Sequence, residues 1–153
     1  VNGYLINRNA QGYSSELDIS GNRIDSSKAI IAFEKDGFSE NPLFYCFVAE
    51  INKEVIGIAL YYYRYSTWKG KTIHLEDLIV KESKRGQGVG MALYKSVMEY
   101  AASFNVKRVE WVVLGWNTPA IKFYEKTGAT ILKDWYLAQF DQEGLSNFIS
   151  PNS

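Results

Sequence analysis

The densest group of residues suited to chemistry is the glycine-rich run Arg85-Gly86-Gln87-Gly88-Val89-Gly90. It stands just before an apolar pattern typical of an amphipathic helix, where the first backbone N–H groups lack helical partners and the helix dipole is positive. Glycines allow a bulky anion to approach the backbone closely, so a phosphate or pyrophosphate is the expected ligand. Lys84 and Arg85 would add positive charge. The run predicts an anion-binding loop, with a plain glycine-rich turn as the alternative.

Two common nucleotide-binding motifs do not fit this chain. A dinucleotide-binding motif requires glycine at the position of Met91. The stretch Gly70-Lys71-Thr72 would suit a P-loop, but the glycine required five residues earlier is Tyr65. The loop is therefore expected to bind a different phosphate-bearing ligand.

The same run resembles the acetyl-CoA motif R/Q-x-x-G-x-G/A of the GNAT superfamily of N-acetyltransferases. Within that superfamily the chain is similar to the diamine/polyamine and thialysine acetyltransferases. The resemblance covers about residues 36–143 and is carried by the glycine run and by residues 36–38 (DGF), 61–71 (YYYRYSTWKGK), 75–80 (LEDLIV) and 117–129 (NTPAIKFYEKTGA).

The activity implied by the resemblance transfers an acetyl group to a primary amine by direct attack in a ternary complex. A lysine-like amine, with a pKa near ~10.4, must lose a proton before it attacks. The resemblance implies Glu76 as the base, directly or through water, and an ordinary solvent-facing strand carboxylate is the alternative. It implies Tyr124 as the acid that protonates the leaving thiolate, and core packing is the alternative for this helical residue.

The resemblance also implies how acetyl-CoA and the amine are held. Backbone groups of strand residues would pair with the pantetheine arm, and an amide there would hold the oxyanion. Asn117 would bond the arm or, equally, fix the turn before Pro119. The predicted cofactor-binding residues are Leu78, Ile79, Val80, Arg85, Gly86, Gln87, Gly88, Val89, Gly90, Asn117 and Tyr124. The predicted substrate-binding residues are Glu76, Asp77, Trp68 and Trp135, the tryptophans through cation–π faces, with core packing as the alternative for Trp135.

The chain departs from the polyamine acetyltransferases at one turn and near its start. Ser66 stands where those enzymes carry an acidic residue, which favours a shorter amine with an amino-acid end. The family's first helix and acidic loop are not recognisable in residues 8–28, although Glu16 and Asp18 could replace that loop. The family habit also implies a homodimer. Two other functions stay open: acetylation of protein lysines or N-termini, and CoA binding without turnover.

The elements that must position these residues follow from hydrophobic periodicity. A short edge strand is expected at 4–7 and a helix over 28–35 that ends at Gly37. Strands at 44–51, 54–65 and 72–80 should form an antiparallel meander, with a turn at Asn52-Lys53. Apolar spacing of three and four predicts a helix over 88–104, followed by a strand at 107–114 that returns parallel to strand 72–80. A helix capped by Thr118 and closed by Gly128 comes next, then strands at 129–132 and 135–140 and a weak terminal helix.

Together with the resemblance, this order predicts an α/β (α+β) fold. The expected core is a GNAT-like mixed, mostly antiparallel sheet of about six to seven strands with helices on both faces.

Length and composition predict a single domain over residues 1–153, with 46% apolar residues for a core, and the resemblance implies that it is an N-acetyltransferase (GNAT) domain. The 17 basic and 17 acidic residues balance, so bulk charge favours neither nucleic acid nor an anionic membrane as a partner. No apolar run approaches the roughly 18 residues of a membrane helix, and the start lacks a signal-peptide pattern, so a cytoplasmic location is expected. The lone His74 argues against a metal site and is expected to be structural, while the lone Cys46 is expected to be buried and inert.

Overall fold

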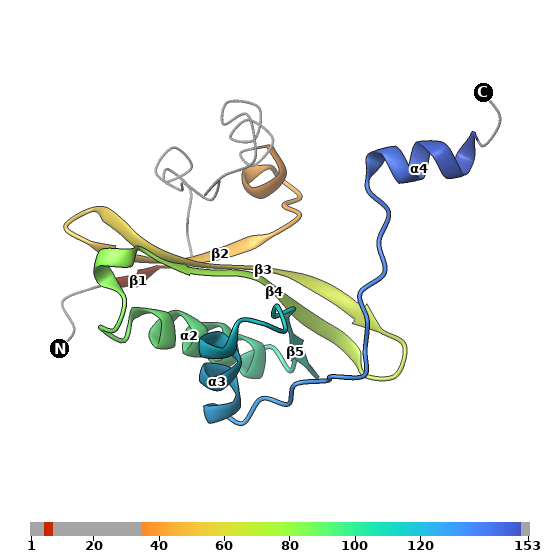
Figure 1. Cartoon of the computed structure of the whole chain (residues 1–153). Coiled ribbons are helices and arrows are strands. Elements are labelled where there is room, and N and C mark those ends of the chain that lie inside the picture. Colours follow the sequence, from red (N-terminus) through yellow and green to blue (C-terminus); the bar gives the residue numbers. More distant parts are fainter. Residues whose placement is uncertain (1–4, 8–34, 151–153) are drawn as a thin grey trace. The chain divides into compact units, whose positions relative to one another are not determined.

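The computed structural model describes residues 5–7 and 35–150 of the chain. Its elements, in order, are β1 (Leu5–Asn7), β2 (Tyr45–Ile51), β3 (Glu54–Ser66), β4 (Gly70–Val80), the 3-10 helix η1 (Glu82–Lys84), α2 (Val89–Ser103), β5 (Val109–Glu110), α3 (Thr118–Lys126) and α4 (Gln142–Ile149) (Figure 1). Contacts divide the chain into two compact units, the first ending at Val112 and the second beginning at Val113. A single domain therefore stays a prediction.

Within the described residues the first unit holds one five-stranded sheet in the order β1-β2-β3-β4-β5. The strands from β1 to β4 pair antiparallel in sequence order, and β5 joins β4 in parallel after the crossover through α2. The β2–β3 turn places Asn52 and Lys53 at φ of 50° and 67°, as the twist of a two-residue hairpin requires. The predicted meander and parallel return are confirmed.

Helix α2 packs against one face of the sheet (Figure 1). Its buried residues recur every three or four positions, which confirms the predicted periodicity, and they are Val89, Leu93, Tyr94, Val97 and Ala101. Gly57 of β3 lets the helix come close. A Cβ there would stand 2.9 Å from the Ile79 carbonyl oxygen and 3.0 Å from Leu93 Cδ1.

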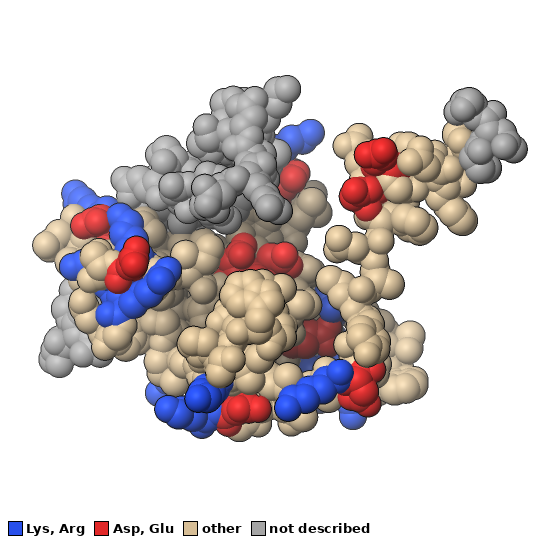
Figure 2. Space-filling model, viewed as in Figure 1, with Lys and Arg blue, Asp and Glu red and all other residues tan. Residues whose placement is uncertain are grey.

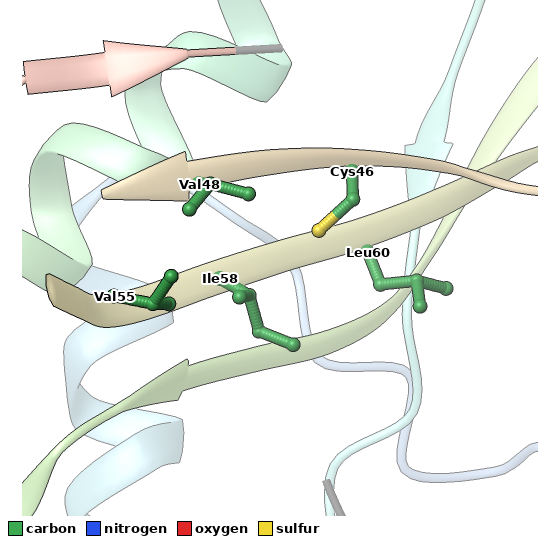
Figure 3. Packing of buried hydrophobic residues seen from close by; sticks show 5 residues of the cluster. All are labelled: Cys46, Val48, Val55, Ile58 and Leu60. Carbon is green, nitrogen blue, oxygen red and sulfur yellow. The ribbon is translucent and has the colours of Figure 1, made fainter. Parts of the chain in front are cut away.

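The opposite face carries a second apolar cluster. Phe47 of β2 faces α2, with its ring 6.1 Å from that of Tyr100. Because side chains alternate along a strand, the neighbours Cys46 and Val48 point to the other side. There they form a cluster with Val55, Ile58 and Leu60 (Figure 3). Phe38 and Phe44 pack against this cluster. The predicted mixed α/β class, with helical residues over both faces, is confirmed.

Several predicted boundaries change. Residues 35–38 are helical and include Gly37, where the helix was expected to end, and residues 28–34 of the expected helix lie outside the described part. The strand expected at 107–114 is reduced to Val109–Glu110.

Neither strand expected at 129–132 or 135–140 forms in the described chain. A strand requires a hydrogen-bonded neighbour, and an apolar pattern alone cannot supply one. The weak terminal helix is confirmed as α4. Over residues 5–7 and 35–150 no helix has the length and apolar character needed to span a membrane.

Candidate active site

The glycine-rich run forms the connection from η1 into α2. Gly86 and Gly88 have φ of 73° and 83°, in the left-handed region that favours glycine. Gly88 is the N-cap of α2. A Cβ added to Gly86 would meet no heavy atom within 4 Å, so the space beside this residue is open. The two glycines therefore fix a turn that an ordinary residue would adopt only under strain.

The loop is braced by its own side chains. Arg85 Nε donates to the Val80 carbonyl at 3.2 Å, and Gln87 Nε2 donates to the Ser83 carbonyl at 3.3 Å. The first turn of α2 holds no acidic residue. No carboxylate of the helix itself therefore offsets the positive end of its dipole, which favours an anion at this end.

Charges around the loop are mixed. Figure 2 shows acidic and basic side chains intermingled at the left, over the η1 segment. Lys81 Nζ lies 2.9 Å from Glu54 Oε1, and this hydrogen bond and the lysine charge lower the pKa of Glu54. Attraction of an anion to this region would thus depend on backbone amides more than on a basic patch.

Strands β4 and β5 part just before the candidate base. They pair only at Ile73↔Val109 and His74↔Glu110. Beyond His74, and within the described residues, β4 pairs with β3 alone. In the described chain no strand pairs with its other edge over residues 75–80, where the Val80 carbonyl accepts from Arg85 Nε. Backbone groups on such an edge can pair with an added extended segment. The predicted cofactor-binding residues 78–80 lie on this edge.

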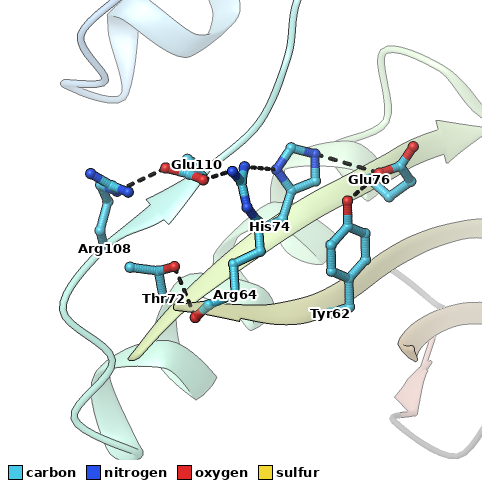
Figure 4. A network of polar contacts seen from close by, with 7 residues as sticks. All are labelled: Tyr62, Arg64, Thr72, His74, Glu76, Arg108 and Glu110. Carbon is cyan, nitrogen blue, oxygen red and sulfur yellow. Dashed lines mark hydrogen bonds and ion pairs between the residues drawn. The ribbon is translucent and has the colours of Figure 1, made fainter. Parts of the chain in front are cut away.

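Glu76 occupies a β-bulge in β4. Leu60 is opposite Asp77 and Tyr61 is opposite Leu75, so Glu76 is the extra residue. Bulges re-aim a side chain and are frequent next to active sites. The Glu76 side chain is 49% exposed. The Tyr62 hydroxyl donates to its Oε2 at 3.0 Å, and His74 Nε2 lies 3.4 Å from the same atom (Figure 4).

The groups beside Glu76 have shifted proton affinities. Burial raises the pKa of Asp77, and the neighbouring Glu76 charge adds to the effect. Burial also raises the pKa of Tyr62, reinforced by its hydrogen bond to Glu76. Both groups therefore stay protonated to higher pH than usual, so Tyr62 is a donor to Glu76 at neutral pH.

The second unit carries three of the predicted residues, which are Asn117, Tyr124 and Trp135. Asn117, rather than the predicted Thr118, is the N-cap of α3, because its side chain accepts a hydrogen bond of 3.3 Å from the Ala120 N–H. Asn117 thus fixes the turn before Pro119. The predicted close of the helix at Gly128 is confirmed by its φ of 89°. Tyr124 lies in α3, half-buried, with its ring 5.3 Å from that of Phe123.

The two candidate tryptophans are exposed. Trp68, in the β3–β4 turn, has 88% of its surface accessible, and Trp135 has 71%. Within the second unit Trp135 is thus not packed into a core.

Cys46 is buried as predicted, and burial raises the pKa of its thiol to about 12. A thiol that stays protonated is inert at neutral pH, which agrees with the prediction.

Sequence analysis missed the residues around Glu76. Tyr62 faces His74 across the β3–β4 pair, with ring centroids 5.1 Å apart, and Arg64 Nη1 lies 3.3 Å from His74 Nδ1. His74 was expected to be merely structural. The signal available in the sequence was the spacing of Tyr62 and Arg64, which places both on one face of a strand.

Known proteins place the chain in a family. The model of the acetyltransferase (GNAT) family matches residues 11–129. The chain is 39% identical over 125 residues to the thialysine N-epsilon-acetyltransferase of Bos taurus, with 74% of each chain covered. It is 34% identical over 141 residues to the spermidine/spermine N(1)-acetyltransferase-like protein 1 of Homo sapiens, covering 85% of this chain and 20% of that one.

A solved structure shares the fold. An integron cassette protein from V. cholerae superposes with a TM-score of 0.80 at 24% identity, covering 96% of this chain and 98% of that one. The extent of the family match and the identity to the bovine relative lead to one conclusion. The chain belongs to the acetyltransferase (GNAT) family and is an N-acetyltransferase.

Proposed function

We propose that this N-acetyltransferase moves the acetyl group of acetyl-CoA to the side-chain amine of a small lysine-like amino acid such as thialysine. The amine attacks directly while both substrates are bound. The observation that carries the proposal is the β-bulge at Glu76, which presents a half-exposed carboxylate in the part of β4 that has parted from β5. The similarity to a thialysine N-epsilon-acetyltransferase supports this acceptor class.

The residues of the first unit fit acetyl-CoA as a substrate. An extended pantetheine arm would pair with the open β4 edge at Leu78, Ile79 and Val80, as a strand does. The diphosphate would lie against the backbone of residues 85–90, where glycine conformation and the open space beside Gly86 coincide with the start of α2. Asn117 is proposed to contact the arm in addition to capping α3. Bound acetyl-CoA supplies the thioester carbonyl.

Glu76 would take the proton from the acceptor ammonium, directly or through water, because a carboxylate half open to solvent can reach it. Asp77 and the exposed faces of Trp68 and Trp135 would hold the cationic end of the acceptor. Tyr124 would return a proton to the thiolate as it leaves.

The turn between β3 and β4 bears on the acceptor's length. Ser66 accepts a hydrogen bond of 3.1 Å from the Lys69 N–H, so its side chain serves the turn. The turn lacks the carboxylate that would hold the distal ammonium of a polyamine at this point. This favours an acceptor with one reactive amine, and diamines and polyamines are the alternative acceptors.

The test measures thiol release from acetyl-CoA with thialysine, lysine, ornithine, putrescine, spermidine and a lysine-containing peptide. We expect the highest kcat/KM with thialysine or lysine. A higher kcat/KM with spermidine would show that the acceptor is a polyamine and not a lysine-like amino acid. Reaction with the peptide alone would indicate a protein acetyltransferase, and CoA binding without any turnover would indicate a binding module. Light scattering of the same sample tests the proposed homodimer.

A further inference from the structure

We propose that His74 is a positioning residue that holds the Glu76 carboxylate by its Oε2 atom, so that Oε1 receives the proton of the acceptor amine. The inference rests on the proposed function, because it requires Glu76 to act as the base.

The contact with Arg64 determines which ring nitrogen of His74 carries the hydrogen. Arg64 Nη1 lies 3.3 Å from His74 Nδ1. A guanidinium has only donors, so Nδ1 must accept, and the neutral ring then carries its hydrogen on Nε2. Nε2 lies 3.4 Å from Glu76 Oε2, which is longer than an ordinary hydrogen bond, and its N–H is the polar group nearest that oxygen from the His74 side. Arg64 thereby selects the tautomer that can hold the carboxylate.

Arg64 is itself fixed from the neighbouring strand. Its Nη1 lies 2.5 Å from Oε1 of Glu110, and Arg108 Nε lies 2.8 Å from the other oxygen of that carboxylate (Figure 4). Glu110 belongs to β5 and is opposite His74 in the last pair that joins β4 to β5. The chain of ion pairs from Arg108 through Glu110 to Arg64 therefore reaches His74 at the point where β4 and β5 part. Glu76 lies two residues further along β4.

The ring has little freedom to turn away. His74 is 8% exposed and stacks on Tyr62 at an interplanar angle of 26°. The Tyr62 hydroxyl donates to the same Oε2 of Glu76. Both contacts that the described residues make to this carboxylate thus fall on one oxygen. The Tyr62 hydrogen bond and the longer polar contact with His74 together restrict the rotation of the carboxylate, as a positioned base requires.

Two substitutions of the buried His74, one apolar and one polar, test its role. His74→Phe keeps an aromatic ring against Tyr62 and removes both nitrogens. We expect kcat to fall about tenfold, since a polar group that faces a charged group is worth about that factor, while the KM for acetyl-CoA stays unchanged. His74→Gln carries an amide that can donate to Glu76 and accept from Arg64, and it should restore kcat to within about threefold of wild type.

A double variant and a control separate positioning from folding. In a Glu76→Gln background, His74→Phe should cause no further loss of kcat, because the group that it positions is gone. Thr72→Val is the matched control. Thr72 is buried in the same strand and donates to the Arg64 carbonyl at 3.0 Å. Its replacement should lower the melting temperature and leave kcat unchanged.

The outcomes distinguish the two proposals. A wild-type protein that acetylates no amine would overturn both of them. With an active wild type, three results would overturn the role of His74 alone: a His74→Phe kcat within about twofold of wild type, a Gln variant as slow as the Phe variant, or a loss that persists without Glu76.

Discussion

Replacement of Gly86 by alanine tests the anion-binding loop with a small change. The φ of Gly86 is 73°, where a residue with a Cβ pays about 1–2 kcal/mol. The added Cβ would meet no heavy atom within 4 Å, so no steric clash adds to this backbone cost. We therefore expect the free energy of unfolding to fall by about 1–2 kcal/mol, or about 2–4 °C in melting temperature for each kcal/mol.

Gly86→Ala should weaken the binding of CoA by more free energy than it removes from folding. The methyl group would occupy the open space beside the loop, where the diphosphate of CoA is proposed to lie. A hydrogen bond to a charged group contributes about 1.5–3 kcal/mol, and each 1.4 kcal/mol is a factor of ten in affinity. Loss of one amide–phosphate bond would therefore raise the Kd for CoA by about 10–100-fold.

Calorimetric titration with CoA measures this Kd, and thermal unfolding of the same samples measures stability. Gly70→Ala is the matched control, because Gly70 has φ of 90° and its added Cβ also meets no atom within 4 Å. It should lose similar stability and bind CoA as wild type does. Wild-type affinity in Gly86→Ala, or equal weakening in both variants, would refute the proposed loop.

Three further predictions concern single residues. Tyr124→Phe should lower kcat by at least tenfold and leave the Kd for CoA unchanged, and an unaltered rate would remove Tyr124 from the mechanism. Burial raises the folded-state pKa of Asp77, so its ionised form costs stability at pH 7 and this cost disappears as the pH falls to the ordinary Asp value. Asp77→Asn should thus unfold at higher urea than wild type at pH 7, with a gain that shrinks toward pH 4, and a less stable variant at pH 7 would contradict the burial argument. Cys46, with a pKa of about 12, should resist iodoacetamide in the native protein at pH 8 and react in urea, so rapid native alkylation would contradict its burial.

Local pattern was enough to predict much of the first unit. The spacing of apolar residues located α2 to within one or two positions, because one face of a helix must be buried. Two strand-like apolar runs joined by the Asn52-Lys53 turn located the β2–β3 hairpin, because the two strands of a hairpin are adjacent in sequence. Glycines before a helix identified the loop, since positive φ and close approach of an anion both depend on residues adjacent in sequence.

Local patterns could not predict which distant segments of the chain pair with one another. Residues 129–140 have strand-like composition, yet no strand in the described chain pairs with them. The cap of α3 also shifted by one residue to Asn117, since both candidate side chains suit the position and only the backbone path decides between them.

By itself the sequence determined the family, the glycine loop and the identity of the candidate base. Only the tertiary structure decided what surrounds that base. The bulge at Glu76 depends on the register between β3 and β4, and the contact of His74 with Arg64 depends on the same register. Glu110 reaches Arg64 only because β5 pairs with β4 for two residues and then parts. These arrangements arise from hydrogen bonding between strands far apart in the chain, which no local pattern encodes.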